Sequence, residues 1–142
     1  PRLRLLHNPA PEKGQGPSLA LAAREAAGLG AEMLLITLAD MPLVTPELIR
    51  KVARAAQASP DGAAVCERRA ANSPPAAFAA RHFPALAGLA GDRGAREILR
   101  SLPDIGRAPA GRQELLDVDT PAQLAEAADL LGNAALYTAK TS

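Results

Sequence analysis

Two aspartates occupy the same kind of position in the sequence, at the end of an apolar segment and directly before a turn. Asp40 ends the segment MLLITLAD and precedes the dipeptide MP, and Asp119 ends the segment ELLDVD and precedes the dipeptide TP. In open α/β sheets ligands bind beyond the carboxyl ends of the strands, so both carboxylates would face one crevice. Together they could hold Mg²⁺, which binds one or two carboxylates along with waters and substrate phosphates. The two acids therefore predict a site for a phosphate-bearing ligand.

A simpler interpretation of each aspartate also stays open. A loop aspartate such as Asp40 can close a turn with its own side chain, and Asp119 can cap the helix expected after it. Asp117 lies two residues before Asp119, so on a strand both would face the same side.

A glycine-rich segment, EKGQGPS at 12–18, precedes a predicted helix. Gly14 and Gly16 permit close approach of the backbone to a ligand. Ser18 stands where a helix cap is expected, and the free amides of that helix could meet an anion or a nucleobase edge. The segment is not the phosphate-binding loop GxxxxGK[ST], because no Lys-Ser or Lys-Thr pair follows. An ordinary loop that binds no ligand could have the same residues.

The segment GDRGAR at 91–96 is the fourth stretch that could carry chemistry. Asp92 is predicted to cap a helix that begins near Gly94. Arg93 and Arg96 would then lie near the start of that helix, where cations oppose the helix dipole. Basic residues in that position indicate an anionic ligand, although solvated side chains would show the same pattern.

The elements that must position these residues alternate between strands and helices, with the segment ANSPPAAF at 71–78 as a loop. Strands are predicted at 3–7, 33–38, 63–68, 105–108 and 113–119, and helices at 19–27, 45–58, 77–89, 94–102 and 122–131. A continuous apolar run such as that at 33–38 is typical of a strand covered on both faces. The order predicts an α/β fold with a mainly parallel sheet and helices on both faces.

Composition excludes several classes of protein. The chain has 16 basic and 15 acidic residues, no basic block and only three aromatic residues, which argues against a nucleic-acid partner. A single cysteine, Cys66, excludes an internal disulfide and fits a reducing, cytoplasmic location, where it would be a small buried side chain. No apolar run approaches the roughly 20 residues of a membrane span, so no membrane association is expected.

Four segments, taken together, resemble the molybdenum cofactor cytidylyltransferases and other MobA-like nucleotidyltransferase domains. They are NPAPEKGQGPSLALA, LLITLADMPLVTPELI, PPAAFAARHFPALAGLAGDRGAREIL and LLDVDTPAQLA, and they extend from about Asn8 to Leu131. The elements LADMP and DVDTP are shared across the wider superfamily, whereas GDRGAR is typical of the cytidylyltransferase branch.

This resemblance implies a Rossmann-like nucleotidyltransferase fold. It also implies transfer of a nucleotidyl group, typically CMP from CTP, to molybdopterin during molybdenum cofactor biosynthesis, with Mg²⁺ as cofactor and a molybdoenzyme as a further partner. The residues implied for the site are Asp40 and Asp119 as catalytic and metal-binding acids, Gly14, Gly16 and Ser18 near the nucleotide, and Asp92 and Gly94 on the acceptor side.

The chain also departs from the family. It has no match to the loop LAAGxSxRxG that opens the family and wraps the triphosphate, and Ser73 stands before Pro74 where relatives usually carry Gly. We therefore expect residues 1–132 to be the C-terminal part of a MobA-like domain, incomplete at its N-terminus and inactive alone, with residues 133–142 as a tail. The alternative is a non-catalytic accessory or binding protein with a degenerate transferase fold.

Overall fold

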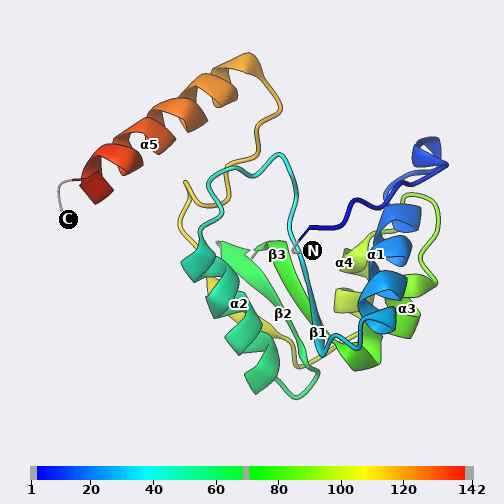
Figure 1. Ribbon diagram of the computed structural model, residues 1–142. Coiled ribbons are helices and arrows are strands. Elements are labelled where there is room, and N and C mark those ends of the chain that lie inside the picture. The colour runs from blue at the N-terminus through cyan, green and yellow to red at the C-terminus, as the bar shows by residue number, and fades with distance from the viewer. Residues whose placement is uncertain (1–2, 69–70, 140–142) are drawn as a thin grey trace.

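A four-stranded mixed sheet forms the centre of the structure, a computed structural model that describes residues 3–68 and 71–139 (Figure 1). The strands are β1 (Met33–Ile36), β2 (Ala63–Arg68), β3 (Ala71–Ala79) and β4 (Gly106–Pro109), in the spatial order β1-β3-β2-β4. Strand β3 is antiparallel to both β1 and β2, and β2 is parallel to β4. The predicted α/β class is confirmed, but the sheet is mixed rather than mainly parallel in its pairing.

Strand β3 occupies the segment that was predicted as a loop because of its two prolines. Its register against β2 shifts between Val65 and Cys66, where the partner changes from Ala76 to Ser73. The prolines at 74 and 75 fall in this irregularity, where the β2 ladder requires no donor from them. The loop prediction was therefore wrong, and β3 fills the central position between β1 and β2.

Two other predicted strands are absent from the described part of the sheet. Residues 3–7 are exposed and form no strand. Residues 113–119 form no strand either: Leu115 packs in the core against β2 and β3, and Val118 N donates a backbone hydrogen bond of 2.9 Å to Asp40 O. Residues 113–119 are thus a loop that contacts the loop after β1 rather than a strand beside β1.

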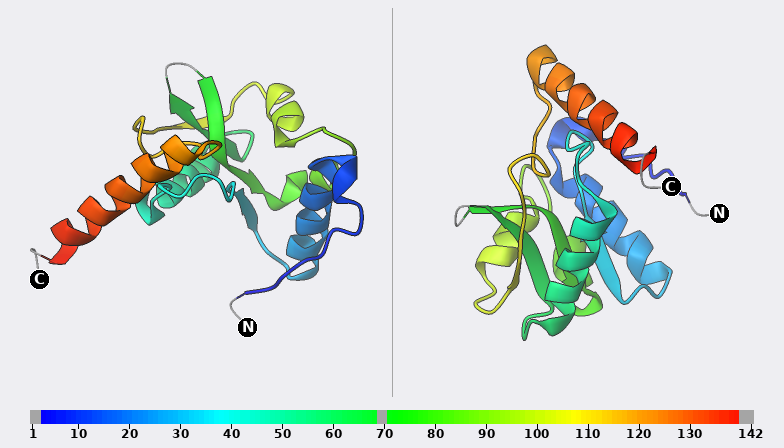
Figure 2. Two further views of the ribbon diagram at one scale, coloured as in Figure 1. Left: turned by 90° about the horizontal axis from the view of Figure 1, so that it is seen from above. Right: turned by 90° about the vertical axis from the view of Figure 1, so that its left-hand side faces the viewer.

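Helices cover both faces of the sheet, as expected (Figure 2). They are α1 (Gly16–Gly28), α2 (Pro46–Ala58), α3 (Phe83–Ala87), α4 (Ala95–Arg100) and α5 (Pro121–Ala139), with 3₁₀ turns η1 (Pro11–Lys13) and η2 (Ala80–His82). The predicted helix at 77–89 is shorter than expected, because β3 extends through Ala79. Helix α5 continues past 132 to Ala139, so residues 133–139 are helical rather than a separate tail, and 140–142 lie outside the described residues.

Alternate residues of β2 enter two different cores. Ala63 and Val65 pack with α1, α3 and α4, whereas Ala64 and Cys66 pack with α2. Phe78, which is fully buried, and Phe83 are the two largest side chains of the first core. This alternation follows from the strand period of two, and it holds the sheet rigidly between its helix layers.

Helix α5 projects away from the sheet (Figures 1 and 2). Ala127 is 1% exposed, but Leu124 and Leu131 keep 60% and 46% of their surface exposed. In the described residues, no helix has the length and hydropathy needed to cross a lipid bilayer.

Candidate active site

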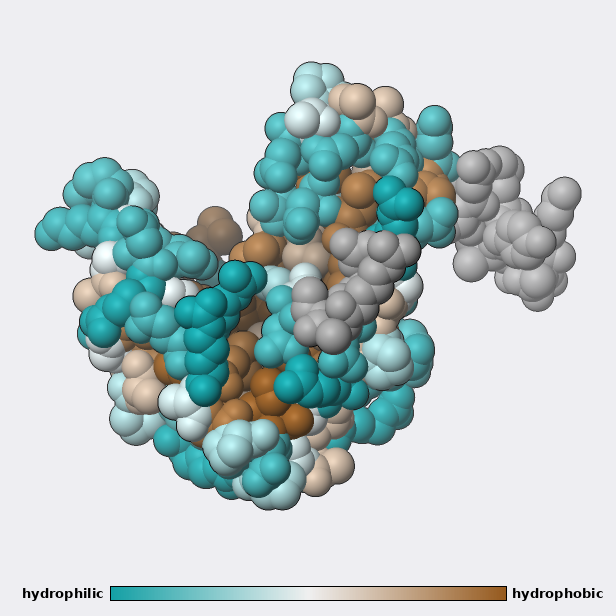
Figure 3. All heavy atoms as spheres, turned by 180° about the vertical axis from the view of Figure 1, so that it is seen from behind, coloured by the Kyte–Doolittle hydropathy of each residue, from teal (hydrophilic) through white to brown (hydrophobic). Residues whose placement is uncertain are grey.

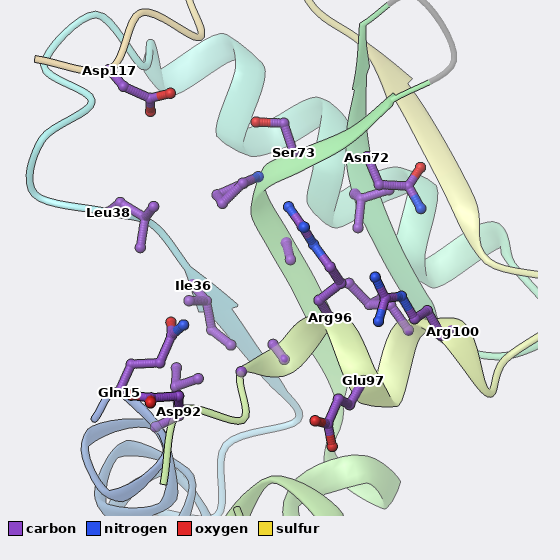
Figure 4. Close-up of a pocket in the computed structure, with 17 residues that line it drawn as sticks. Gln15, Ile36, Leu38, Asn72, Ser73, Asp92, Arg96, Glu97, Arg100 and Asp117 are labelled. Atoms are coloured by element: carbon purple, nitrogen blue, oxygen red, sulfur yellow. The ribbon is translucent and has the colours of Figure 1, made fainter. Parts of the chain in front are cut away.

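A cavity of about 850 Å³ opens between β1, β3, α4 and the loops before α1 and α5 (Figure 4). Its apolar lining includes Leu19, Ile36 and Val65, and its polar lining comes mainly from β3, α4 and the loops. The volume falls in the range of about 300–1,000 Å³ that ligand pockets occupy. The cavity is large enough for a small organic ligand with a phosphate group.

The two predicted acids lie at one end of the sheet, next to this cavity. The hydrogen bond of 2.9 Å from Val118 N to Asp40 O holds the two loops together, and Asp119 is the residue after Val118. Both acids are exposed, and neither lines the cavity, whereas Asp117 does. This hydrogen bond brings together the two loops that carry the acids, and the role of the acids toward a metal stays a prediction.

Neither carboxylate is used to cap local structure. The turn after Asp40 is closed by the backbone bond from Met41 N to Leu38 O of 3.4 Å. Within residues 3–68 and 71–139, the carboxylates of Asp40 and Asp119 make no hydrogen bond or ion pair. The simpler interpretation of both residues as caps is therefore not what the structure shows.

Thr120 and Gln123 cap α5 instead of Asp119. The Thr120 hydroxyl accepts a hydrogen bond from Gln123 N at 3.3 Å, and the Gln123 side-chain oxygen accepts from Asp119 N at 3.0 Å. This reciprocal arrangement is close to a capping box. It fixes the backbone at Asp119 and leaves the carboxylate available.

A second link holds the acidic loop against α2. Thr45, which caps α2 by accepting from Leu48 N at 3.1 Å, also donates its hydroxyl to Glu114 Oε1 at 3.2 Å. The other Glu114 oxygen accepts from Gly111 N at 2.9 Å. The loop that carries Asp117 and Asp119 is thus tied to the start of the helix that follows Asp40.

The glycine-rich segment docks onto the GDRGAR segment. Gly16 N donates to Gly91 O at 2.9 Å, and a Cβ at Gly16 would lie 2.8 Å from that oxygen. Gly14 has φ +91°, and a Cβ there would lie 2.2 Å from Asp92 Oδ1 and 2.7 Å from Gly91 O. The chain's own backbone fills the space that these glycines leave, so their contact with a nucleotide stays a prediction.

The remaining predicted residues lie around this docked pair of loops. Ser18 sits in the first turn of α1 and accepts from Asn8 Nδ2 at 2.9 Å, whereas the cap position is Gln15. Asp92 lines the cavity but does not cap α4, whose cap position is Gly94 and has no side-chain bond. Both predicted caps were wrong, while Asp92 and Gly94 do face the cavity.

A family model for the MobA-like NTP transferase domain matches residues 1–106. The chain belongs to the family of MobA-like NTP transferase domains. It is also 37% identical over 117 residues to the purine catabolism protein PucB of Bacillus subtilis (strain 168), an alignment that covers 78% of this chain and 54% of PucB. The chain thus spans about half the length of the curated relative it matches. The predicted class of nucleotidyltransferase domain is confirmed.

The sequence missed several residues that line the cavity of this MobA-like domain. Asn72 and Ser73 were assigned to a loop, yet they belong to β3, and Arg107 Nη1 donates to Asn72 Oδ1 at 2.6 Å. Arg100 was not singled out, although it lies four residues after Arg96 and therefore on the same side of a helix. That spacing was the available signal.

The thiol of Cys66 takes no part in the site of the MobA-like domain. It is buried, and burial, with Glu114 as a further cause, raises the pKa of Cys66 to about 11. The thiol is therefore protonated at neutral pH and is a poor nucleophile. The prediction of a small buried side chain is confirmed.

Proposed function

We propose that this MobA-like domain transfers a CMP group, or another nucleoside monophosphate, from its triphosphate to molybdopterin in molybdenum cofactor biosynthesis. In this reaction an oxygen of the acceptor phosphate bonds to the α-phosphorus, the bond from that phosphorus to the bridging oxygen breaks, and pyrophosphate leaves with the electron pair. The observation that carries the proposal is the hydrogen bond of 2.9 Å between Val118 N and Asp40 O, which joins the two acidic loops beside the cavity. CTP is favoured because the GDRGAR segment is typical of the cytidylyltransferase branch.

The acids fit a magnesium site by their chemistry. Asp40 and Asp119 would hold Mg²⁺, since both carboxylates are exposed and unbonded within the described residues. In that part of the chain no group of three or more His, Cys, Asp or Glu side chains could hold a metal, so waters and phosphates would complete the shell. When bound, Mg²⁺ would neutralise charge on the nucleotide phosphates.

The two docked loops beside the cavity would divide between the two substrates. Gln15 lines the cavity and lies against Gly94, where its amide can donate to and accept from the edge of a nucleobase. Gly14 and Gly16 would keep this loop close to the GDRGAR segment and so set the width of the cavity. Asp92 would face the acceptor.

A second candidate function is that of a non-catalytic accessory protein for a molybdoenzyme. One observation favours it: the relative PucB is named for purine catabolism rather than cofactor synthesis. Charge stabilisation by preorganised donors carries much of the rate in such reactions, and losing one donor costs a factor of about 10²–10³. An accessory protein would keep the cavity and lose the turnover.

The deciding experiment measures pyrophosphate release with CTP, Mg²⁺ and molybdopterin. The chain is assayed alone and as a longer form that includes any segment encoded directly upstream in its gene. The variants D40N and D119N are compared with D129N, which changes an exposed acid on α5. We expect release by the longer form, loss of release in D40N and D119N, and none in the chain alone. Molybdopterin binding without release in either form would favour the accessory protein.

A further inference from the structure

Two arginines on α4 line the cavity without an acid bound to either. Arg96 and Arg100 are separated by one helical turn, so their side chains lie next to each other. Within residues 3–68 and 71–139, neither guanidinium group makes an ion pair or a hydrogen bond. Their charge is therefore not neutralised by the described part of the protein.

The arginines and the acids occupy different parts of the cavity (Figure 4). Arg96 extends from α4 toward β3, in the direction of Ser73, whereas Glu97, which also lines the cavity, points in the opposite direction. Asp117 lies across the cavity near the end of β1, on the side of the two acidic loops. The cavity thus has a basic side on α4 and an acidic side at the loops.

Apolar side chains lie between these two sides. Leu19, Ile36 and Leu99 line the cavity, and Leu99 is only 8% exposed. Seen from behind, hydrophobic residues gather on the lower half of the molecule and are bordered by hydrophilic ones (Figure 3). An apolar surface next to two guanidinium groups suits a ligand with a flat ring system and an attached anion.

We propose that Arg96 and Arg100 bind the phosphate group of the acceptor, a heterocycle that carries a phosphate monoester. This proposal rests on the proposed function, in which the acceptor carries a phosphate monoester and the acidic side of the cavity would hold the nucleotide. Guanidinium groups bind phosphate oxygens through paired N–H donors, so two adjacent arginines can hold and orient a phosphate group. Arg93, by contrast, donates from Nε to Ala90 O at 3.4 Å and does not line the cavity.

The test uses phenyl phosphate, a flat ring with a phosphate monoester, titrated by calorimetry into the whole chain without nucleotide or metal. R96Q and R100Q are compared with R93Q as the matched control, and R96K keeps the charge without the paired donors. Hydrogen bonds to charged groups contribute about 1.5–3 kcal/mol, so we expect Kd to rise about 10- to 100-fold in R96Q and R100Q. R93Q should bind as the parent does, and R96K should fall between.

Three results would overturn the assignment. Unchanged binding in R96Q would mean that the arginine is only solvated, and equal weakening in R93Q would mean that only net charge matters. Displacement of phenyl phosphate by CTP without metal would mean that the arginines hold the nucleotide instead. Urea unfolding of each variant shows whether the fold is kept, and R96K gives a binding result even where R96Q unfolds.

The same titration separates this proposal from the proposed function. If pyrophosphate release fails in every form while Arg96-dependent binding of phenyl phosphate persists, the transfer reaction is wrong and the phosphate site stands. If release occurs and R96Q binds phenyl phosphate as the parent does, the phosphate site alone is wrong.

Discussion

Replacing Gly14 with alanine should destabilise the protein strongly. The loss should exceed that at a glycine of positive φ that has free space around the added Cβ. The added Cβ would lie 2.7 Å from the backbone oxygen of Gly91 and 2.2 Å from Asp92 Oδ1. The Asp92 side chain can turn away, but the backbone oxygen belongs to a docked loop. Overpacking of this kind costs about 1–3 kcal/mol.

Backbone strain adds to that cost. Gly14 has φ +91° and ψ −171°, a region that is essentially limited to glycine and costs about 1–3 kcal/mol for other residues. The two contributions predict a loss of about 2–6 kcal/mol in the free energy of unfolding for G14A. If the two docked loops move apart to make room for the added Cβ, the loss in the free energy of unfolding is smaller and the wall of the cavity shifts.

Two glycines provide matched controls. Gly30 has φ +65° and no atom within 4 Å of the Cβ that alanine would add, so G30A measures backbone strain alone. Gly28 ends α1 and also has nothing within 4 Å, so G28A should change stability little. Urea unfolding gives the free energies, and phenyl phosphate titration reports on the cavity. A G14A variant no less stable than G30A, with unchanged titration, would refute the packing argument.

Three further outcomes are expected. T45A should lose about 1 kcal/mol in the free energy of unfolding, because Thr45 caps α2 through Leu48 N, and urea denaturation compared with T45S checks this. F78A should lose about 3–5 kcal/mol by the same measurement, because Phe78 is fully buried, and a smaller loss would mean that the core collapses around the gap. The raised pKa of Cys66 means that the folded state holds the thiol proton more tightly than the unfolded state does. The free energy of unfolding is therefore at its full value below about pH 8.5, the ordinary pKa of a thiol, and falls as the pH rises toward about 11. C66A should remove that fall, and an equal fall in C66A would assign it to other groups.

Local signals predicted some elements well. The helix starts at Thr45 and Thr120 were found from the Thr-Pro pairs, and both threonines accept the expected backbone donor. These caps depend on residues three positions apart, so the sequence contains the whole interaction. The acids at 40 and 119 were singled out from their place after apolar segments, and their role in a site stays a prediction.

Non-local contacts explain what the sequence did not reveal. Prolines in ANSPPAAF indicated a loop, yet the register shift at Val65 and Cys66 lets them sit within β3. The apolar segment LLDVD indicated a strand, yet it forms a loop in which Val118 N bonds to Asp40 O. The glycine-rich loop indicated a ligand, because the neighbouring residues in the sequence do not reveal that Gly16 packs against Gly91 of the same chain.

The docking of residues 14–16 onto residues 90–92 has a consequence for protein engineering. A loop exchanged from a relative brings its own side chains against a partner that has not changed, and the Cβ positions at Gly14 and Gly16 leave no room for a mismatch. Attempts to change specificity by grafting only one of these segments should yield poorly folded chimeras. The two segments are best treated as one transferable cassette, and substitutions in one are expected to be inherited together with substitutions in the other.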